Sequence, residues 1–383
     1  MAQQHLDPTD PTAGPVSGDA LAGYLRAQAT EFLRALRQHR ETGGDAGGPA
    51  RTRARVGDNG SEEAVDAARA LRRSARRISA SLHTFRPLLD ADWSEAMRPE
   101  LAWLSGTLAM EHAYAARLER LLLALHRLSG ATALPAQAGV LGVPGSDAAP
   151  GGRTAAIKGA PADSGPPSHP AAAPERGNLT VGAAKAGALL ERQLTLARTR
   201  AHSSALQALG SSRFHAVADS IALLASEVPL TPAAATADLR PLAAAAEERL
   251  TDAVAALPLV TAGSPYNAEA LIHGLSPDPA PHPQDAPWHQ VRLLLRLHRY
   301  GREVLHGENC PVDVRLLGAG QSLNRHRDAS EAAAAAAQAA RTPRIAPATA
   351  YALGVLHADQ RHEVEAARFA FQQSWQMQTV GTP

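Results

Sequence analysis

The sequence predicts an all-α protein, and three observations support that prediction. Alanine, leucine and arginine dominate the segments in which apolar residues recur at helical spacing. Alternating valine, isoleucine, threonine and aromatic residues, which indicate strands, are scarce. Proline and glycine stand at most boundaries between the patterned segments, as Gly210 and Pro232 do. We therefore expect a fold built from packed helices.

The elements follow in order from these patterns. Residues 1–17 are polar and proline-rich, so we expect a disordered tail, and the glycine-rich residues 41–60 are expected to form a loop. Within the second helix Leu71, Ile78 and Leu82 recur on one face, as a core-facing stripe requires. The expected helices are 18–40, 61–88, 94–129, 184–209, 212–226, 231–256, 284–306, 321–341 and 346–376.

A long segment without apolar periodicity divides the chain. Residues 130–182 are rich in glycine, proline, alanine and serine, and this composition and length favour a disordered linker. The expected organisation is a tail at 1–17, a first helical half at 18–129, the linker, and a second helical half at 183–378.

Composition limits the classes of function. The formal net charge is only +1, so positive charge is concentrated locally and the whole molecule is not a basic nucleic-acid binder. The single Cys310 excludes an internal disulfide and a multi-cysteine metal site. Neither an N-terminal apolar leader nor an apolar run of membrane-spanning length is present, so we expect a cytoplasmic protein without membrane contact.

Two acid-free stripes of cations are the strongest indication of function. The first extends from Ala67 to Leu89 and the second from Ala286 to Arg302. They share one spacing, because Arg69, Arg72 and Arg76 in the first match His289, Arg292 and Arg296 in the second. On a helix the cations fall opposite the apolar residues. The first stripe comprises Arg69, Arg72, Arg73 and Arg76, and the second comprises His289, Arg292, Arg296, Arg299 and Tyr300.

A solvated helix face is the alternative interpretation of each stripe. Such a face usually mixes signs in i,i+4 pairs, whereas stacked like charges cost a few tenths of a kcal/mol per pair. Two stripes of matching spacing favour a site for a polyanion. Arginine suits phosphate in particular, because its planar fork can donate to two oxygens.

Other chemistry is weakly supported. His282, His289 and His298 lack the spacing of the usual zinc sites, and we expect no metal and no cofactor. Cys310 has no base nearby in sequence except His306, so it is interpreted as a bystander. The run Ala332–Ala337 reflects helix propensity.

Several segments together resemble the CHAD domain, the conserved histidine α-helical domain. LRRSARRISASLHTFRPLLD resembles its opening motif, and HQVRLLLRLHRYGREVL resembles its second motif. Leu108–Ala113 and LNRHRDASEAA are similar to its paired leucine–glycine/arginine–aspartate segments, and YALGVLHADQRHEVEAARFAFQQSW is similar to its closing helix. The resemblance covers residues 18–378, with insertions at the linkers.

The resemblance implies a pseudo-two-fold pair of helical bundles that face a basic central groove or pore. It also implies binding of inorganic polyphosphate and association with polyphosphate granules. The cations carried over by motif are Arg69, Arg72, Arg76, Arg77, His289, Arg292, Arg296, Arg299, Tyr300 and Arg327, to which the stripe adds Arg73.

The first half departs from the family pattern. Arg69 stands where the motif has histidine, and His112–Ala113 replaces the first arginine–aspartate pair. In the second motif Leu293 and Leu297 stand at positions expected to be basic.

The leading hypothesis is non-catalytic polyphosphate binding. A decayed scaffold for protein partners and a weak nucleic-acid binder are the alternatives, and few aromatic residues stand ready to stack on bases. An enzyme is not expected, because no acidic metal cluster accompanies the cations. The sequence leaves the oligomeric state open, with a homo-oligomer among the alternatives.

Overall fold

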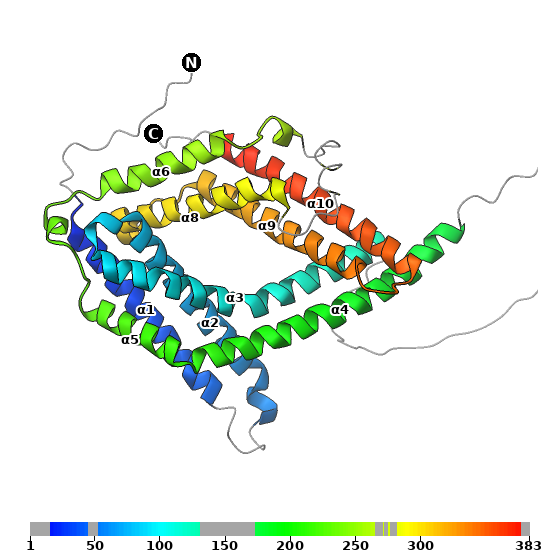
Figure 1. The fold of residues 1–383 in the computed structure, drawn as a ribbon, viewed down its shortest axis with the longest axis horizontal. Coiled ribbons are helices and arrows are strands. Elements are labelled where there is room, and N and C mark those ends of the chain that lie inside the picture. The colour runs from blue at the N-terminus through cyan, green and yellow to red at the C-terminus, as the bar shows by residue number, and fades with distance from the viewer. Residues whose placement is uncertain are drawn as a thin grey trace, which may run out of the picture.

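The all-α prediction is confirmed (Figure 1). The structure, a computed structural model, describes residues 16–44, 53–130, 173–264, 271, 275 and 282–376. Within these residues the only β pairing is an isolated bridge between Leu89 and Leu230. The long helices are α1 (Gly18–Gly44), α2 (Arg53–Thr84), α3 (Ala91–Leu128), α4 (Ala173–Leu209), α5 (Ser212–Ser226), α6 (Arg240–Ala255), α8 (Ala286–His306), α9 (Val314–Ala340) and α10 (Pro347–Gln376).

Short side chains fix where several helices begin. Asp90 accepts a hydrogen bond from the backbone N–H of Trp93 at 2.8 Å and starts α3. Ser211 caps α5 in the same way, and Asp313 caps α9. These bonds satisfy backbone donors that lack a partner within the helix. At the other end of α8, Gly307 adopts a φ of +57°, a conformation that glycine reaches without strain, and the helix stops there.

One expected helix is wrong, because 231–256 is not continuous. The structure has a short 3₁₀ helix, η3 (Pro232–Ala235), and then α6, which begins at Arg240. Pro241 occupies the first turn of α6 and cannot donate a backbone hydrogen bond there. Asp238 Oδ1 instead accepts from the Arg240 backbone N–H at 3.1 Å, so the chain turns before α6.

Helices extend into two segments that the sequence predicts to be irregular. Of the loop expected at 41–60, residues 41–44 continue α1 and residues 53–60 belong to α2, and residues 45–52 lie outside the described residues. Residues 173–182, expected to close the linker, form the start of α4. The rest of that expected linker, 131–172, lies outside the described residues, as do residues 1–15 of the expected tail.

Three apolar clusters hold the helices together. The first joins α1, α2, the first half of α3 and α5, with Phe32, Phe85 and Phe214 fully buried. Because α5 follows the expected linker, this cluster draws on both sides of it. Each buried side chain of this size contributes roughly 1.5–3 kcal/mol relative to exposure.

The second cluster surrounds α8 and includes Trp288 and Phe371. The third joins the end of α3 to α4, α9 and α10, and it contains Ala332 and Ala336 at helical spacing. The alanine run expected from propensity alone therefore also serves packing, because its small side chains fill the interface with neighbouring helices.

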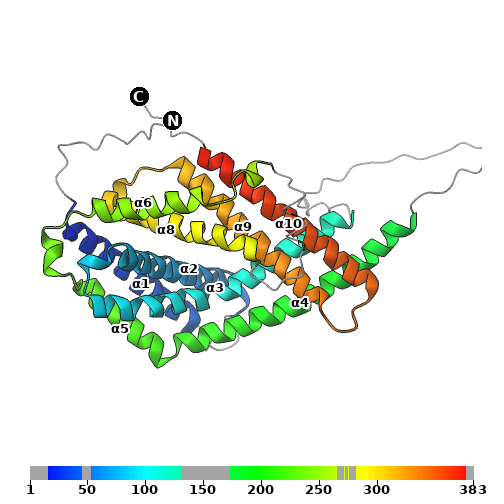
Figure 2. The same ribbon diagram turned by 45° about the horizontal axis from the view of Figure 1, so that its top comes forward.

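The arrangement of the helices is elongated in outline (Figure 1). The α3 and α4 helices extend along one side, and α8, α9 and α10 extend along the other; the same order is visible in the turned view (Figure 2). Helix α2 contacts both α3 and α8. The first basic stripe is therefore carried on a helix that joins the two sides. The pseudo-two-fold relation between the halves stays a prediction.

No helix among the described residues is both long enough and apolar enough to cross a lipid bilayer.

Candidate anion-binding site

Four half-buried arginines from the two stripes form the centre of the candidate site. Arg72 and Arg76 belong to α2, and Arg292 and Arg296 belong to α8. Their helices turn the opposite faces into the core, as fully buried Leu71 shows on α2. The amphipathic pattern thus places the guanidinium groups away from the apolar clusters. We call these four residues the central cluster.

Mutual repulsion is visible in the pKa values of the central cluster. Burial lowers the pKa of Arg72, and the charges of Arg327 and Arg296 lower it further. Burial, then Arg72 and Arg296, lowers the pKa of Arg76 to about 10. Burial, then Arg296, Arg327 and Arg76, lowers the pKa of Arg292 to about 9. Cations from three separate helices therefore act on one another.

The central cluster has no carboxylate in ion-pair contact among the described residues, although the charge of Asp328 acts to raise the pKa of Arg292. Across the described residues, none of its four arginines forms an ion pair. Arg292 Nε donates to Asn324 Oδ1 of α9 at 2.8 Å, which is a neutral partner. Arg72 Nε is buried without a hydrogen-bond acceptor. Buried charge without a partner is costly, so an added anion would relieve this arrangement.

Arg327 approaches the central cluster from α9 but carries its own carboxylates. Its Nε donates to Asp328 Oδ1 at 2.9 Å and lies 3.8 Å from Glu331 Oε1. Its charge nevertheless lowers the pKa of Arg72 and Arg76. Arg327 is thus a partly neutralised cation at the border of the cluster.

Arg77 and Tyr300, unlike the central cluster, are held by contacts with other side chains of the protein. Arg77 Nε donates to Glu303 Oε2 at 2.7 Å, and its guanidinium lies 5.5 Å from the centre of the Tyr300 ring. Burial would lower the pKa of Arg77, but the bond to Glu303 outweighs it and raises the value. Tyr24 of α1 also donates to Glu303, at 3.0 Å. Arg77 therefore joins α2 to α8.

The remaining stripe cations lie on the rim. Arg69 is exposed and pairs with Asp66 at 3.0 Å, one residue beyond the acid-free stretch. Arg73 and Arg299 are exposed, and Arg299 adds to the charge that lowers the pKa of Arg296. All three can extend a positive surface from the centre.

Two histidines border the cluster. The Nε2 atom of His289 is buried without a partner, and burial is the main cause of its lowered pKa. On α3, His112 has a pKa lowered by burial and then by Arg69 and Arg72. His112, which replaces a cation in the family pattern, is thus brought to the same surface as the first stripe.

Sequence reasoning missed a buried charged network behind α8. Asp285, which is fully buried at the start of α8, accepts hydrogen bonds from Arg361 at 2.8 Å and Arg368 at 2.7 Å of α10. Ser330 of α9 donates to it at 2.8 Å. Burial would raise the pKa of Asp285, but Arg361 and the other cations hold it at about 2. The spacing of Arg361 and Arg368, two turns apart on one face, was the available signal.

His326 connects this network to the candidate site. Its Nε2 lies 3.6 Å from Asp285 Oδ1, and its ring stacks on Trp288 at a centroid distance of 5.6 Å. It also meets the His289 ring edge-on at 5.5 Å. Burial, then Arg368, lowers the pKa of His326 to about 3. The network therefore holds α8 against α9 and α10 next to His289, the first residue of the second stripe.

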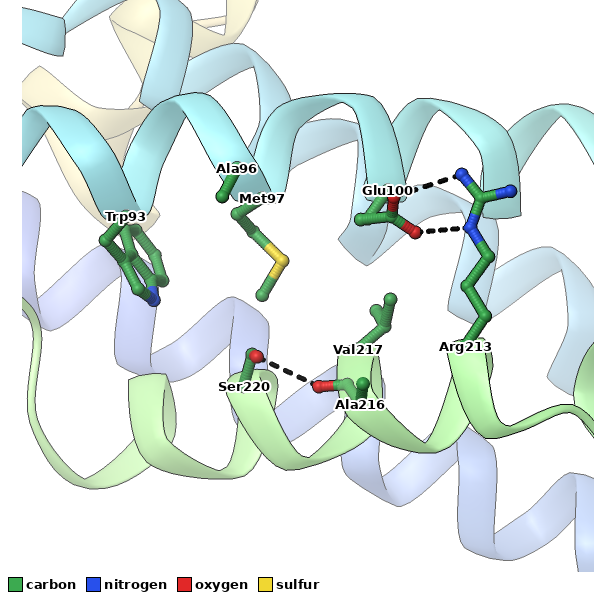
Figure 3. Close-up of a pocket in the computed structure, with 8 residues that line it drawn as sticks. All are labelled: Trp93, Ala96, Met97, Glu100, Arg213, Ala216, Val217 and Ser220. Atoms are coloured by element: carbon green, nitrogen blue, oxygen red, sulfur yellow. Dashed lines mark hydrogen bonds and ion pairs between the residues drawn. The ribbon is translucent and has the colours of Figure 1, made fainter.

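A separate pocket lies between α3 and α5 (Figure 3). Trp93, Met97 and Val217 supply its apolar wall. At its edge Arg213 donates to both oxygens of Glu100, at 2.6 and 3.0 Å (Figure 3). None of the stripe residues lines this pocket, and its one cation is neutralised, so it is not the candidate site.

Among the residues with described positions, no group of three or more histidine, cysteine, aspartate or glutamate side chains is arranged to hold a metal ion.

The fold and the central cluster define a class: an all-helical protein that concentrates cations from α2, α8 and α9 on one surface. The model of the CHAD domain family matches residues 27–337, and the chain belongs to that family. The solved structure of "PptA from Streptomyces chartreusis" is 67% identical and has a TM-score of 0.70. That alignment covers 95% of this chain and 100% of PptA. No curated protein matches the chain.

Membership of the CHAD family is consistent with a polyphosphate-related binding function at the level of the family. The match also confirms the resemblance drawn from the two motifs.

Proposed function

We propose that this protein binds inorganic polyphosphate without catalysis, at a surface centred on Arg72, Arg76, Arg292 and Arg296. One observation carries the proposal: these half-buried arginines come from two distant stripes, depress one another's pKa and form no ion pair within the described chain. An arrangement of this kind costs stability unless an anion compensates it.

The remaining stripe residues extend the proposed surface. We infer that Arg69, Arg73, His289, Arg299 and Arg327 extend the row of donors beyond the central cluster, whereas Arg77 and Tyr300 support it by joining α2 to α8. Polyphosphate is a flexible linear polyanion, so a row of donors suits it better than a closed pocket. Charge-assisted hydrogen bonds to phosphate contribute roughly 1.5–3 kcal/mol each in favourable sites.

Nucleic acid is the second candidate for the same surface. It presents phosphates too, but tight single-strand binding uses aromatic rings that stack on bases. On the cation faces of the two stripes, Tyr300 is the one aromatic residue. The guanidinium of Arg77 already lies over its ring. The proposal therefore favours polyphosphate, and it extends to association with polyphosphate granules in the cell. A scaffold for protein partners is the interpretation that remains if no polyanion binds.

The test compares two variants of equal charge. In the first, Arg72, Arg76, Arg292 and Arg296 are replaced together by alanine. In the control, the exposed residues Arg37, Arg40, Arg192 and Arg200 of α1 and α4 are replaced instead. Binding of long-chain polyphosphate, DNA and RNA is measured at several salt concentrations.

The expected result is loss of polyphosphate binding in the first variant and retention in the control, with both folded by circular dichroism. Wild-type affinity should fall steeply with salt, because bound counter-ions are released from the polyanion. Polyphosphate incubated with the protein should keep its length on a gel. Equal binding by the two variants would overturn the site, and tighter binding of DNA or RNA would overturn the ligand.

A further inference from the structure

The cation face of α2 continues beyond the central cluster. His83 follows Arg76 by seven residues, and at about 100° per residue it lies on the same face. From Arg69 to His83 this face extends for about 21 Å at 1.5 Å per residue. His83 is exposed, so its ring lies at the surface of the molecule.

A second group of cations gathers around His83. Arg98 of α3 lies with its Nη2 3.1 Å from His83 Nδ1. Partial desolvation by neighbouring residues lowers the pKa of His83, and the charges of Arg98, Arg249 and Arg86 lower it further. Arg249 comes from α6 and Arg86 from the short helix η2 (Arg86–Leu88). Four separate elements thus direct cations or an imidazole to one place, which we call the α2-end cluster.

One carboxylate accompanies the α2-end cluster. Glu95 pairs with Arg86 at 2.8 Å and lies 3.9 Å from Arg98. Arg249 is exposed and has no ion pair among the described residues. Among the ion pairs of the described residues, Glu95 supplies the only carboxylate that meets any of these three arginines, which leaves a local excess of positive charge.

The surface between the two clusters is free of acids along α3. Helices α2 and α3 are antiparallel, because His112 lies near Arg69 and Arg72 while Arg98 lies near His83. At helical spacing the α3 face between Arg98 and His112 presents only small residues, namely Ala102, Ser105 and Ala109. The acids that flank this face are turned elsewhere: Glu100 pairs with Arg213 of α5, and Glu111 pairs with His202 of α4.

We infer that the α2-end cluster is a second phosphate-binding subsite, reached along the α2–α3 surface by long polyphosphate and not by short chains. The inference rests on the proposed function and adds a selectivity for chain length. A short anion can be satisfied by the central cluster alone, whereas a long one binds at both clusters, which act as linked sites with a high effective concentration.

The experiment replaces Arg98 and Arg249 by glutamine in the full chain. Affinities for long-chain polyphosphate and for tripolyphosphate are measured over a range of salt concentrations. Arg192→Gln with Arg200→Gln on α4 is the matched control, since it removes the same charge from exposed positions. Thermal melting checks that each variant remains folded.

We expect affinity for long-chain polyphosphate to fall about 10-fold or more in the Arg98/Arg249 variant. The slope of log affinity against log salt should become shallower by about one for each phosphate that the variant no longer neutralises. Affinity for tripolyphosphate should stay within about twofold of wild type, and the control should match wild type for both anions.

Unchanged affinity for the long chain, or an equal loss for both lengths, would overturn the second subsite. A lower melting temperature accompanied by equal loss would assign Arg98 and Arg249 to stability and equally count against the inference. Absence of polyphosphate binding by the wild type is a different outcome, because it overturns the proposed function itself.

Discussion

Arg77 of α2 and Glu303 of α8 form an ion pair across 226 positions of the chain, with Arg77 Nε 2.7 Å from Glu303 Oε2. The adjacent Arg76 has no such partner within the described structure and has its pKa lowered to about 10, by burial and then by Arg72 and Arg296. Neighbouring arginines of one stripe therefore have different tasks. Arg77 holds the two basic helices together, and Arg76 leaves its charge available.

Single alanine variants should separate these tasks. Arg77→Ala should lower the free energy of unfolding by about 1–2 kcal/mol, between the values for exposed and buried pairs, because Glu303 loses its cationic partner. Arg76→Ala should leave it unchanged or raise it by a few tenths of a kcal/mol, since a like-charge repulsion is removed. Urea unfolding gives both values. Equal destabilisation by the two variants would contradict this division.

His326 should make the protein less stable in mild acid. The pKa of its ring lies at about 3 in the folded chain, lowered by burial and then by Arg368, against an ordinary value of 6.5. Between these values the unfolded chain binds one more proton than the folded chain. The free energy of unfolding therefore falls as pH decreases from about 6.5 to 3, by up to about 1.4 kcal/mol per pH unit for this residue.

The measurement is urea unfolding at several pH values in wild type and in His326→Gln. Other half-buried histidines with lowered pKa, such as His289, add to the wild-type slope. The His326→Gln variant should lack the part of the pH slope that one additional bound proton contributes, whatever its free energy of unfolding at neutral pH. His126→Gln, at an exposed position, is the matched substitution control. A pH slope in the His326 variant equal to that of wild type would argue against a neutral buried ring.

Asp328 should weaken anion binding by competing for Arg327. Arg327 Nε donates to its carboxylate at 2.9 Å, and an incoming phosphate would have to displace that hydrogen bond. Asp328→Asn should therefore tighten polyphosphate binding about 2- to 5-fold at low salt, equivalent to less than about 1 kcal/mol as for an exposed pair. Titration by fluorescence anisotropy measures this difference.

Glu100→Gln provides the control for Asp328→Asn. It removes one negative charge from an ion pair with Arg213 at the α3–α5 pocket, which no stripe residue lines (Figure 3). A general increase in net charge would tighten binding in both variants alike. Tightening in Asp328→Asn alone is the expected outcome.

Asp285 should be among the most sensitive residues for stability. It is fully buried and accepts hydrogen bonds from Arg361, Arg368 and Ser330. Asp285→Asn leaves buried Arg361 without its counter-charge and leaves buried Arg368 paired with Glu365 alone. Breaking a buried pair in this way typically costs about 3–5 kcal/mol. The exposed-rim change Asp66→Asn should cost less than about 1 kcal/mol. A small effect of Asp285→Asn in calorimetry would show that the network is dispensable.

The sequence by itself determined the helices and the two basic faces. Apolar spacing is a local property, so α5 was predicted at its observed bounds, 212–226, and Leu71, Ile78 and Leu82 were placed in the core. The prediction failed at 231–256, where the effect of Pro241 on the preceding turn was overlooked. The family followed from motif order and is confirmed by the match over residues 27–337.

Only the tertiary structure decided which charges are available. Arg76 and Arg77 are adjacent in sequence and look alike, yet Glu303 neutralises one of them because α2 crosses α8 at that point. The spacing of Arg361 and Arg368 places them on one face of α10, but their pairing with Asp285 depends on how η5 (Pro283–Asp285) and α10 pack. The helical spacing of residues in the sequence indicates which face of its own helix a side chain occupies. The partner opposite that face comes from a distant part of the chain, and electrostatic interaction depends on that distance in space.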